Sequence, residues 1–269
     1  MSTPEVPAKL VKQLRDETGA PMMDCKRALQ ETNLDFDEAR RWLRERGMAQ
    51  AAKRAGRETT EGLVGYRLAD DGRKGAMVAV GCETEPVAKS DEFQAFATKV
   101  LEAVDADGAG AESGLDGERV ELAAKLGENI VFVGSAHYEA VDGELVSAYA
   151  HPPANKIGVL VQLRGGNADL GRKIAMHIAA SSPRWIDRTT VPEDTLSEER
   201  DIYLASDEVQ SKPEQAREKI VEGMLNKRFF GANVLVDQEW IHDSSKTVGQ
   251  ALKEAGAEVV DFQRFSVAG

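Results

Sequence analysis

Hydrophobic residues in the first 47 positions recur at helical spacing in three short runs. Gly19 follows the first run, Pro21 opens the second and Gly47 ends the third, and each residue type is common at such a helix boundary. The residues expected to face inward are Leu10, Val11, Leu14, Cys25, Ala28, Leu29, Ala39, Trp42 and Leu43. So small an apolar set predicts a three-helix recognition module in residues 1–47 rather than an enzyme core.

The hydrophobic period changes after residues 48–61, a polar and alanine-rich stretch that we interpret as a partly helical tether. Alternating residues then flank Asp70-Asp71-Gly72, which is typical of a β-hairpin. The elements expected next are strands at 62–68 and 74–81, helices at 93–104 and 117–126, and a strand at 129–135. Together they predict a first core subdomain, residues 62–142.

A similar order of elements returns roughly 80 residues later and predicts a second core subdomain, residues 143–269. A second hairpin is expected around Pro152-Pro153, because proline favours turns and cannot continue a central strand. The expected elements are strands at 145–151 and 156–163, a helix at 168–180, strands at 232–238 and 259–267, and a short helix after 243–249. The predicted fold class is therefore α+β, with a duplicated hairpin-helix-strand core.

Residues 184–228 interrupt the second subdomain with two predicted helices, at 195–209 and 213–228. Both have few apolar residues and many charges, which is typical of an antiparallel coiled-coil hairpin that projects from a larger body. Ser211 and Glu214 fit a capping box around Pro213, which indicates a helix start there. We expect such an arm to contact another molecule.

The sequence has 46 Asp and Glu residues against 34 Lys and Arg, a formal net charge of −12. Nucleic-acid binding without sequence preference relies on cations that neutralise phosphates, so this charge predicts no direct nucleic-acid partner. The most basic stretch lies near residues 40–57, is interrupted by acidic residues, and is interpreted as a solvated helix end and linker. No apolar signal region or segment of ~20 apolar residues is found, which predicts a cytoplasmic protein with no membrane partner.

Sequence motifs for metal or nucleophilic catalysis are not found, and the protein is predicted to be no enzyme and to need no cofactor. Cys25 and Cys82 lie far apart and form no CxxC pair, which indicates reduced thiols. His177 lies in an apolar helical run and is interpreted as a packing residue. His151 lies on a constrained loop, where a local hydrogen bond and a partner contact both remain open.

Met22 and Met23 stand together at the start of the second predicted helix, close to Lys26. In a domain this small, adjacent methionines cannot easily both point inward. At least one is therefore expected at the surface for a partner, which favours protein recognition over catalysis.

Residues 82–89 lead from the first hairpin into the helix that follows. Thr84 fits a helix N-cap, and the nearby carboxylates would be stabilised by the helix dipole. The same stretch also fits a rigid turn that presents Glu85 and Pro86 to a partner. The residues alone leave these two interpretations open.

Six motifs, in this order and across nearly the whole chain, resemble the bacterial elongation factor Ts family. These proteins are guanine-nucleotide exchange factors of the translational GTPase elongation factor Tu. The motifs are residues 18–29 (TGAPMMDCKRAL), 84–89 (TEPVAK), 157–161 (IGVLV), 174–180 (IAMHIAA), 219–223 (KIVEG) and 243–250 (DSSKTVGQ).

The resemblance implies a ubiquitin-associated-like (UBA-like) fold for the N-terminal helices and a two-subdomain core with a coiled-coil insertion. It also implies that the N-terminal module docks on the nucleotide domain of the GTPase through Met22, Met23 and Lys26. His151 matches a family position that contacts the partner from the second subdomain.

The resemblance further implies a role for the turn formed by Thr84, Glu85, Pro86 and Val87. In the family this turn pushes toward the switch region and dislodges Mg²⁺ from the GTPase. The usual family sequence there is Thr-Asp-Phe-Val, so this chain keeps a carboxylate but has proline in place of the aromatic ring.

The implied partner is elongation factor Tu in its GDP-bound and nucleotide-free forms, with a dimer of heterodimers as one candidate assembly. The implied function is to promote GDP release so that GTP can rebind during translation elongation. One alternative is a UBA-type adaptor or chaperone that binds without exchange activity. Another is an enzyme site built from Glu83, Glu85 and His151, which no spacing in the sequence favours.

Overall fold

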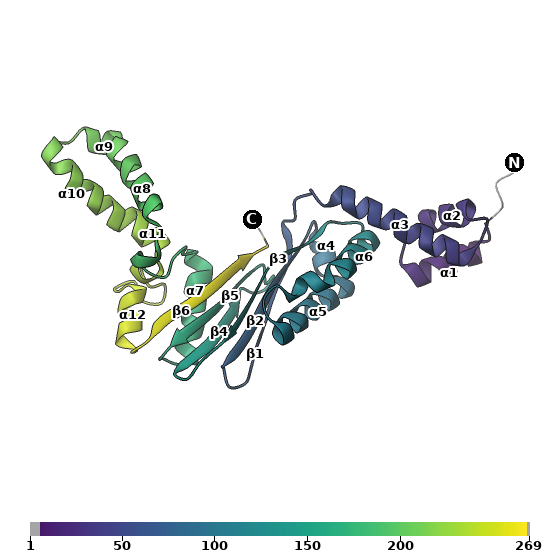
Figure 1. Cartoon of the computed structure of the whole chain (residues 1–269), viewed down its shortest axis with the longest axis horizontal. Coiled ribbons are helices and arrows are strands. Elements are labelled where there is room, and N and C mark those ends of the chain that lie inside the picture. Colours follow the sequence, from purple (N-terminus) through teal and green to yellow (C-terminus); the bar gives the residue numbers. More distant parts are fainter. Residues whose placement is uncertain (1–5, 268–269) are drawn as a thin grey trace. The chain divides into compact units, whose positions relative to one another are not determined.

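The computed structural model describes residues 6–267, and Figure 1 labels its helices and strands along the chain. The strands form two three-stranded sheets with the orders β1-β2-β3 and β4-β5-β6. Two compact units are present: the first takes in the described parts of 1–65, 78–135 and 266–269, and the second takes in 66–77 and 136–265. Helices and sheets together confirm the α+β class, and the predicted domain limits stay predictions.

The N-terminal helices are α1 (Ala8–Thr18), α2 (Met22–Glu31) and α3 (Phe36–Arg54). Gly19 ends α1 at φ 67°, a left-handed conformation that glycine adopts without steric cost. Asp35 caps α3, because its carboxylate accepts a hydrogen bond of 2.8 Å from the backbone N–H of Glu38. The buried residues at the centre of these helices are Val11, Leu14, Cys25, Ala28, Leu29 and Ala39, as the hydrophobic pattern predicted.

Helix α3 is longer than predicted, since it continues through Gly47 to Arg54. The sequence favoured an end at Gly47 because glycine weakens helix interiors. A Cβ at this position would lie 2.9 Å from the Cβ of Ala124 on α6 (Asp116–Leu126), so glycine permits a close helix approach there. The expected helix end was wrong, and the first half of the predicted tether is helical.

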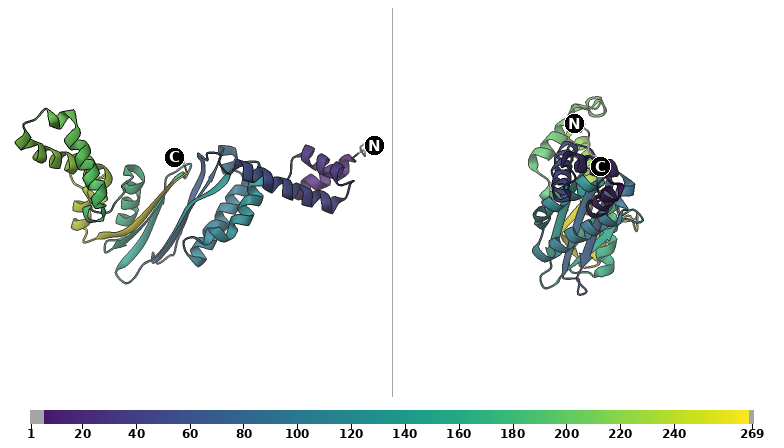
Figure 2. Two further views of the ribbon diagram at one scale, coloured as in Figure 1. Left: turned by 45° about the horizontal axis from the view of Figure 1, so that its top comes forward. Right: turned by 90° about the vertical axis from the view of Figure 1, so that its right-hand side faces the viewer.

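The first sheet contains β1 (Glu61–Leu68), β2 (Lys74–Cys82) and β3 (Ile130–Glu139). The helices that follow β2 are α4 (Glu85–Ala88), α5 (Asp91–Asp107) and α6, and Figures 1 and 2 show α5 and α6 along one face of this sheet. The rings of Phe96 on α5 and Phe132 on β3 stack with centroids 6.0 Å apart. The predicted hairpin, helices and third strand are confirmed within a few residues.

The second sheet contains β4 (Glu144–Ala150), β5 (Ile157–Arg164) and β6 (Glu258–Ser266). Strands β4 and β5 pair antiparallel, with Ala148 opposite Leu160. Helix α7 (Ala168–Ser181) packs on β4 and β5, and α12 (Val248–Glu254) starts at a capping box between Thr247 and Gln250. The largest buried side chains of this core are Tyr149, Leu163, Ile174, Ile178, Leu235, Trp240 and Leu252.

Residues 232–238 do not form the predicted strand. They instead belong to the short helix α11 (Gly231–Asn233) and a 3-10 turn (Leu235–Asp237). The apolar run that suggested a strand is buried through side-chain packing, and only Val234 makes a β-bridge, to Trp185. The third strand of the second sheet is β6, which the sequence predicted at 259–267.

The insertion contains α8 (Glu193–Ala205), α9 (Asp207–Gln210) and α10 (Glu214–Met224), and α10 continues as a π-helix (Leu225–Phe230). Helices α8 and α10 run antiparallel side by side (Figure 1), and their coiled-coil character stays a prediction. The expected capping box was wrong, because the Ser211 hydroxyl donates to the Glu208 carbonyl at 3.0 Å and Pro213 occupies the N-cap position. Within residues 6–267, no helix has the length and apolar character needed to cross a membrane.

Candidate functional site

One face of α2 presents the docking residues predicted from the sequence. Met22 is 51% exposed and Met23 is 70% exposed, and Lys26 is also exposed. Lys26 lies four positions after Met22 and three after Met23, so the three side chains share one side of the helix. The sequence predicted at least one exposed methionine, and in the structure both are exposed.

An adjacent, buried face of α2 anchors the helix. Cys25, Ala28 and Leu29 are fully buried, and the Cys25 thiol donates a hydrogen bond of 3.5 Å to the carbonyl of Ala20. Burial raises the pKa of Cys25, so this thiol stays protonated at neutral pH. Exposed sulfur at Met22 and buried sulfur at Cys25 thus have different roles on one short helix.

The turn between β2 and α5 forms the second predicted element. Thr84, Glu85 and Pro86 are exposed, Val87 is half-buried, and Ala88 is 6% exposed. Ala88 therefore anchors the end of α4, while Thr84, Glu85 and Pro86 are exposed to solvent. Pro86 lies in the first turn of α4, where a missing N–H costs no helical hydrogen bond.

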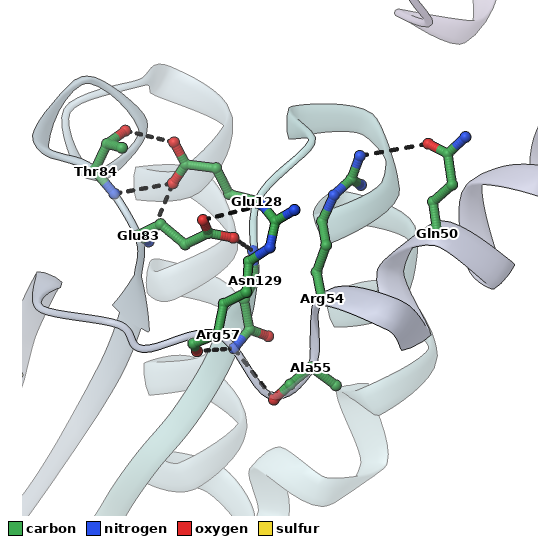
Figure 3. A network of polar contacts seen from close by, with 8 residues as sticks. All are labelled: Gln50, Arg54, Ala55, Arg57, Glu83, Thr84, Glu128 and Asn129. Atoms are coloured by element: carbon green, nitrogen blue, oxygen red, sulfur yellow. Dashed lines mark hydrogen bonds and ion pairs between the residues drawn. The ribbon is translucent and has the colours of Figure 1, made fainter.

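Glu128 holds the start of this turn (Figure 3). Its Oε2 accepts hydrogen bonds from the backbone N–H of Glu83 at 3.1 Å and of Thr84 at 3.0 Å. The hydroxyl of Thr84 donates to Oε1 of the same carboxylate. Thr84 is thus at the predicted N-cap position, but its side chain bonds Glu128 and does not cap α4.

The buried thiol of Cys82 also holds the turn, because it donates a hydrogen bond of 3.4 Å to the carbonyl of Thr84. Burial, and secondly the charge of Glu128, raise the pKa of Cys82 to about 12. The thiol is therefore a hydrogen-bond donor and not a thiolate nucleophile at neutral pH. Cys25 and Cys82 are both free and buried.

The carboxylate of Glu85 forms an exposed ion pair with Lys89 at 2.5 Å, one helical turn further along. The bond to Glu85 raises the pKa of Lys89. Both side chains are well exposed, so the pair orients the carboxylate without adding much stability.

His151 lies on an exposed loop after β4, next to the cis peptide between Pro152 and Pro153. Its Nδ1 lies 2.8 Å from the hydroxyl of Tyr149, so one ring nitrogen has a local hydrogen bond. The ring remains exposed to solvent, and its contact with a partner stays a prediction.

His177 is the packing residue that the sequence indicated. It is fully buried, its Nε2 lies 2.9 Å from Oε1 of Gln238, and burial lowers its pKa. Within residues 6–267, no group of three or more His, Cys, Asp or Glu side chains is placed to hold a metal ion. Nε2 of the exposed His242 lies 3.1 Å from the carbonyl oxygen of Lys173.

The structure therefore brings the predicted residues together in three places. These are the α2 face (Met22, Met23 and Lys26), the turn Thr84–Val87, and the loop at His151, which belongs to the second unit. Sequence analysis did not identify Glu128 and Asn129, the residues that hold the turn. Glu128 lies 44 positions from Thr84, and no local motif marks such a contact.

Comparison with known proteins decides the family. A family model described as "Elongation factor TS" matches residues 83–269. The protein called elongation factor Ts in Thioalkalivibrio sulfidiphilus is 43% identical, with 97% of this chain and 92% of the relative covered. The chain belongs to the elongation factor Ts family. Elongation factors Ts of Methylococcus capsulatus and Photorhabdus laumondii are each 41% identical, again over 97% of this chain and 92% of the relative.

The two comparisons cover the elongation factor Ts chain differently. The family model begins at Glu83, within the turn that Glu128 holds. The relatives match over nearly the full length, so helices of the N-terminal module are included in the similarity. The N-terminal helices therefore lie within the range matched by the full-length relatives, and the turn from Glu83 onward lies within the range matched by the family model.

Proposed function

We propose that this protein is the guanine-nucleotide exchange factor of elongation factor Tu, and that it releases GDP so that GTP can rebind during translation elongation. Membership of the elongation factor Ts family supports this function. The structural observation that carries the proposal is the turn Thr84–Val87, exposed at its tip and held at its base by Glu128.

Docking is assigned to the α2 face. Two exposed methionines supply apolar area that is flexible enough to fit a partner surface, and Lys26 adds a charge beside them. Buried Ala28 and Leu29 fix the helix beneath, so little ordering is required when the partner binds. His151 is proposed to make a further contact from the second unit.

Nucleotide release is assigned to the turn. GDP is held in a GTPase largely through its phosphates and the Mg²⁺ that neutralises them. A turn that displaces this Mg²⁺ leaves the phosphate charges less compensated, and GDP then dissociates faster. Glu85 and Pro86 are the exposed residues that would enter the switch region, with Thr84 and Val87 at the two ends of the turn.

This mechanism requires no covalent chemistry and no cofactor in the factor itself. Linkage requires that the factor weaken GDP binding by the same ratio as GDP weakens factor binding. A coupling free energy of about 3 kcal/mol corresponds to about 150-fold. The proposed complexes therefore include both the GDP-bound and the nucleotide-free GTPase.

Release of a fluorescent GDP analogue from elongation factor Tu tests the proposal directly. Catalytic amounts of the purified chain should accelerate release, and this acceleration should shrink when a chelator has already removed Mg²⁺. Binding without faster release would support the adaptor or chaperone alternative. An acceleration unaffected by the chelator would contradict the assignment of Mg²⁺ displacement to the turn.

The acidic charge of the chain supports a protein partner over a nucleic acid. An assembly as a dimer of heterodimers remains a prediction, which the mass of the purified complex would check by light scattering. The enzyme alternative relied on Glu83, Glu85 and His151, of which the two glutamates belong to the first unit and His151 to the second. Glu83 is engaged by Asn129 and Arg57 within its own unit.

A further inference from the structure

The carboxylate of Glu128 gathers three donors at the base of the turn. The N–H groups of Glu83 and Thr84 and the hydroxyl of Thr84 all point to it, and together they use both of its oxygens (Figure 3). Hydrogen bonds to an ionised acceptor are stronger than neutral ones, so this carboxylate restrains the backbone immediately before the exposed tip.

The turn depends on such outside contacts because α4 has only four residues. An isolated helix this short is unstable in water, so its own hydrogen bonds cannot set the direction of Glu85 and Pro86. The contacts that fix it include those of Glu128, the Cys82 thiol bonded to Thr84, and the burial of Ala88.

Asn129 extends the same network toward the N-terminal helices. Its side-chain amide donates to the carbonyls of Arg57 at 2.8 Å and Ala55 at 3.4 Å, just after α3 ends. Its backbone N–H donates to Oε1 of Glu83 at 2.6 Å, and Arg57 pairs with Oε2 of Glu83 at 3.3 Å. Asn129 is only 3% exposed, which favours a fixed arrangement.

We propose that Glu128 is a positioning residue for GDP release. With Glu83 and Asn129 it forms a clasp, defined here by these three side chains, which fixes the turn Thr84–Val87 and the chain that leaves α3. This inference rests on the proposed exchange function. The clasp holds the turn in one conformation before the GTPase binds. It lies where the chain from the docking helices joins the first sheet.

The clasp and the docking face should affect different kinetic constants. Docking residues contribute binding in every bound state and therefore set KM. The turn acts when GDP leaves, so kcat is proportional to the fraction of molecules in which the turn has the competent conformation. A residue that merely stabilised the fold would change neither constant in protein that is still folded.

Glu128→Gln tests this separation, because glutamine keeps the size of the side chain but removes the charge and one acceptor oxygen. We expect kcat for GDP release to fall about tenfold, equivalent to about 1.4 kcal/mol, while KM for the GTPase stays within about twofold. The matched control is Glu118→Gln, which removes a carboxylate of α6 that pairs with Lys99 at 2.6 Å and leaves the clasp intact. It should retain both wild-type constants.

Amide hydrogen exchange in the free chain supplies a readout that needs no GTPase. Exchange at Glu83 and Thr84 should be about tenfold faster in Glu128→Gln than in the wild type, and unchanged in Glu118→Gln. If the wild-type chain fails to release GDP, the exchange function is wrong, and hydrogen exchange still shows whether Glu128 holds the turn.

A wild-type kcat in folded Glu128→Gln would overturn the proposal, and so would a loss confined to KM. If Glu128→Gln does not fold, Thr84→Val and Thr84→Ser test the same hydrogen bond by changing its donor. Valine removes the hydroxyl donor and should lower kcat, whereas serine keeps the donor and should keep kcat close to that of the wild type. Equal kcat values for the two variants would also overturn the proposal.

Discussion

Nε2 of His177 donates a hydrogen bond to Oε1 of Gln238 across 2.9 Å. The direction follows from the neighbours: the amide nitrogen of Gln238 donates to two backbone carbonyls, and Nδ1 of His177 faces the N–H of Ile241 at 3.4 Å. The imidazole is therefore neutral in the folded chain. Burial is the main cause of its lowered pKa.

We expect this histidine to make the second unit less stable in mild acid. Below about pH 6.5 the unfolded chain binds a proton at His177 that the folded chain does not, so the free energy of unfolding decreases as the pH falls. Urea denaturation at pH 7.5, 6.5 and 5.5 would measure this slope. His177→Gln should flatten it, whereas His242→Gln, at an exposed position, should retain most of it.

Met22→Ala should weaken docking and leave the release step unchanged. Loss of an apolar contact at the centre of an interface costs about 1–2 kcal/mol, so KM for the GTPase should rise about fivefold to thirtyfold while kcat stays the same. Stability should change by less than about 0.5 kcal/mol because the side chain is exposed. Met48→Ala, at a methionine of α3 that is 44% exposed, is the control. A similar KM for both variants would contradict the assignment of the α2 face.

Pro86 allows the missing aromatic ring to be tested by a pair of variants. Pro86→Ala and Pro86→Phe both lose the proline restraint, so their difference isolates the ring. If the partner keeps the pocket implied by the family sequence, Pro86→Phe should release GDP faster than Pro86→Ala. The activation free energy of release should be lower by about 1–2 kcal/mol, which is the contribution of a modest interface contact. Equal rates would mean that the partner surface offers no pocket for a ring at this position.

Two helical glycines should respond oppositely to alanine. A Cβ at Gly171 of α7 would lie 2.7 Å from the Cβ of Ser147 on β4, so Gly171→Ala should destabilise the chain by about 1–3 kcal/mol. Gly223 of α10 has no atom within 4 Å of such a Cβ, so Gly223→Ala should stabilise by about 0.5–1 kcal/mol. Thermal unfolding of the two variants would check the signs. A stabilising Gly171→Ala would contradict the tight packing of α7 on β4.

Local signals in the sequence predicted much of this fold. Gly19 marks a helix end through its backbone freedom, and residues 243–249 predicted the short helix that the structure shows as α12. The alternation around Asp70-Asp71-Gly72 predicted β1 and β2 within about a residue of their observed ends. These signals act over a few residues, so they can be seen without the tertiary structure.

Contacts between distant residues explain most of the failures. Gly47 is compatible with a helix because α6 packs closely against it, and the run at Val234 is buried by side-chain packing instead of strand pairing. The expected capping box failed for a local reason, because the Ser211 hydroxyl bonds the carbonyl of Glu208, three residues earlier. The sequence left open whether residues 84–87 form a helix entry or an exposed turn, and the link to Glu128 depends on the folded chain.

The continuation of α3 to Arg54 has a consequence for dividing the chain into fragments. A fragment that starts at residue 48 would cut through α3 and remove the helical turns before the buried Ala51, although it would keep the segment 55–57 that Asn129 binds. A cut within residues 58–60 lies between that segment and β1, outside any helix or strand. The N-terminal helices should therefore be separated at residues 58–60, which lets the affinity of the isolated module for elongation factor Tu be measured without damage to α3.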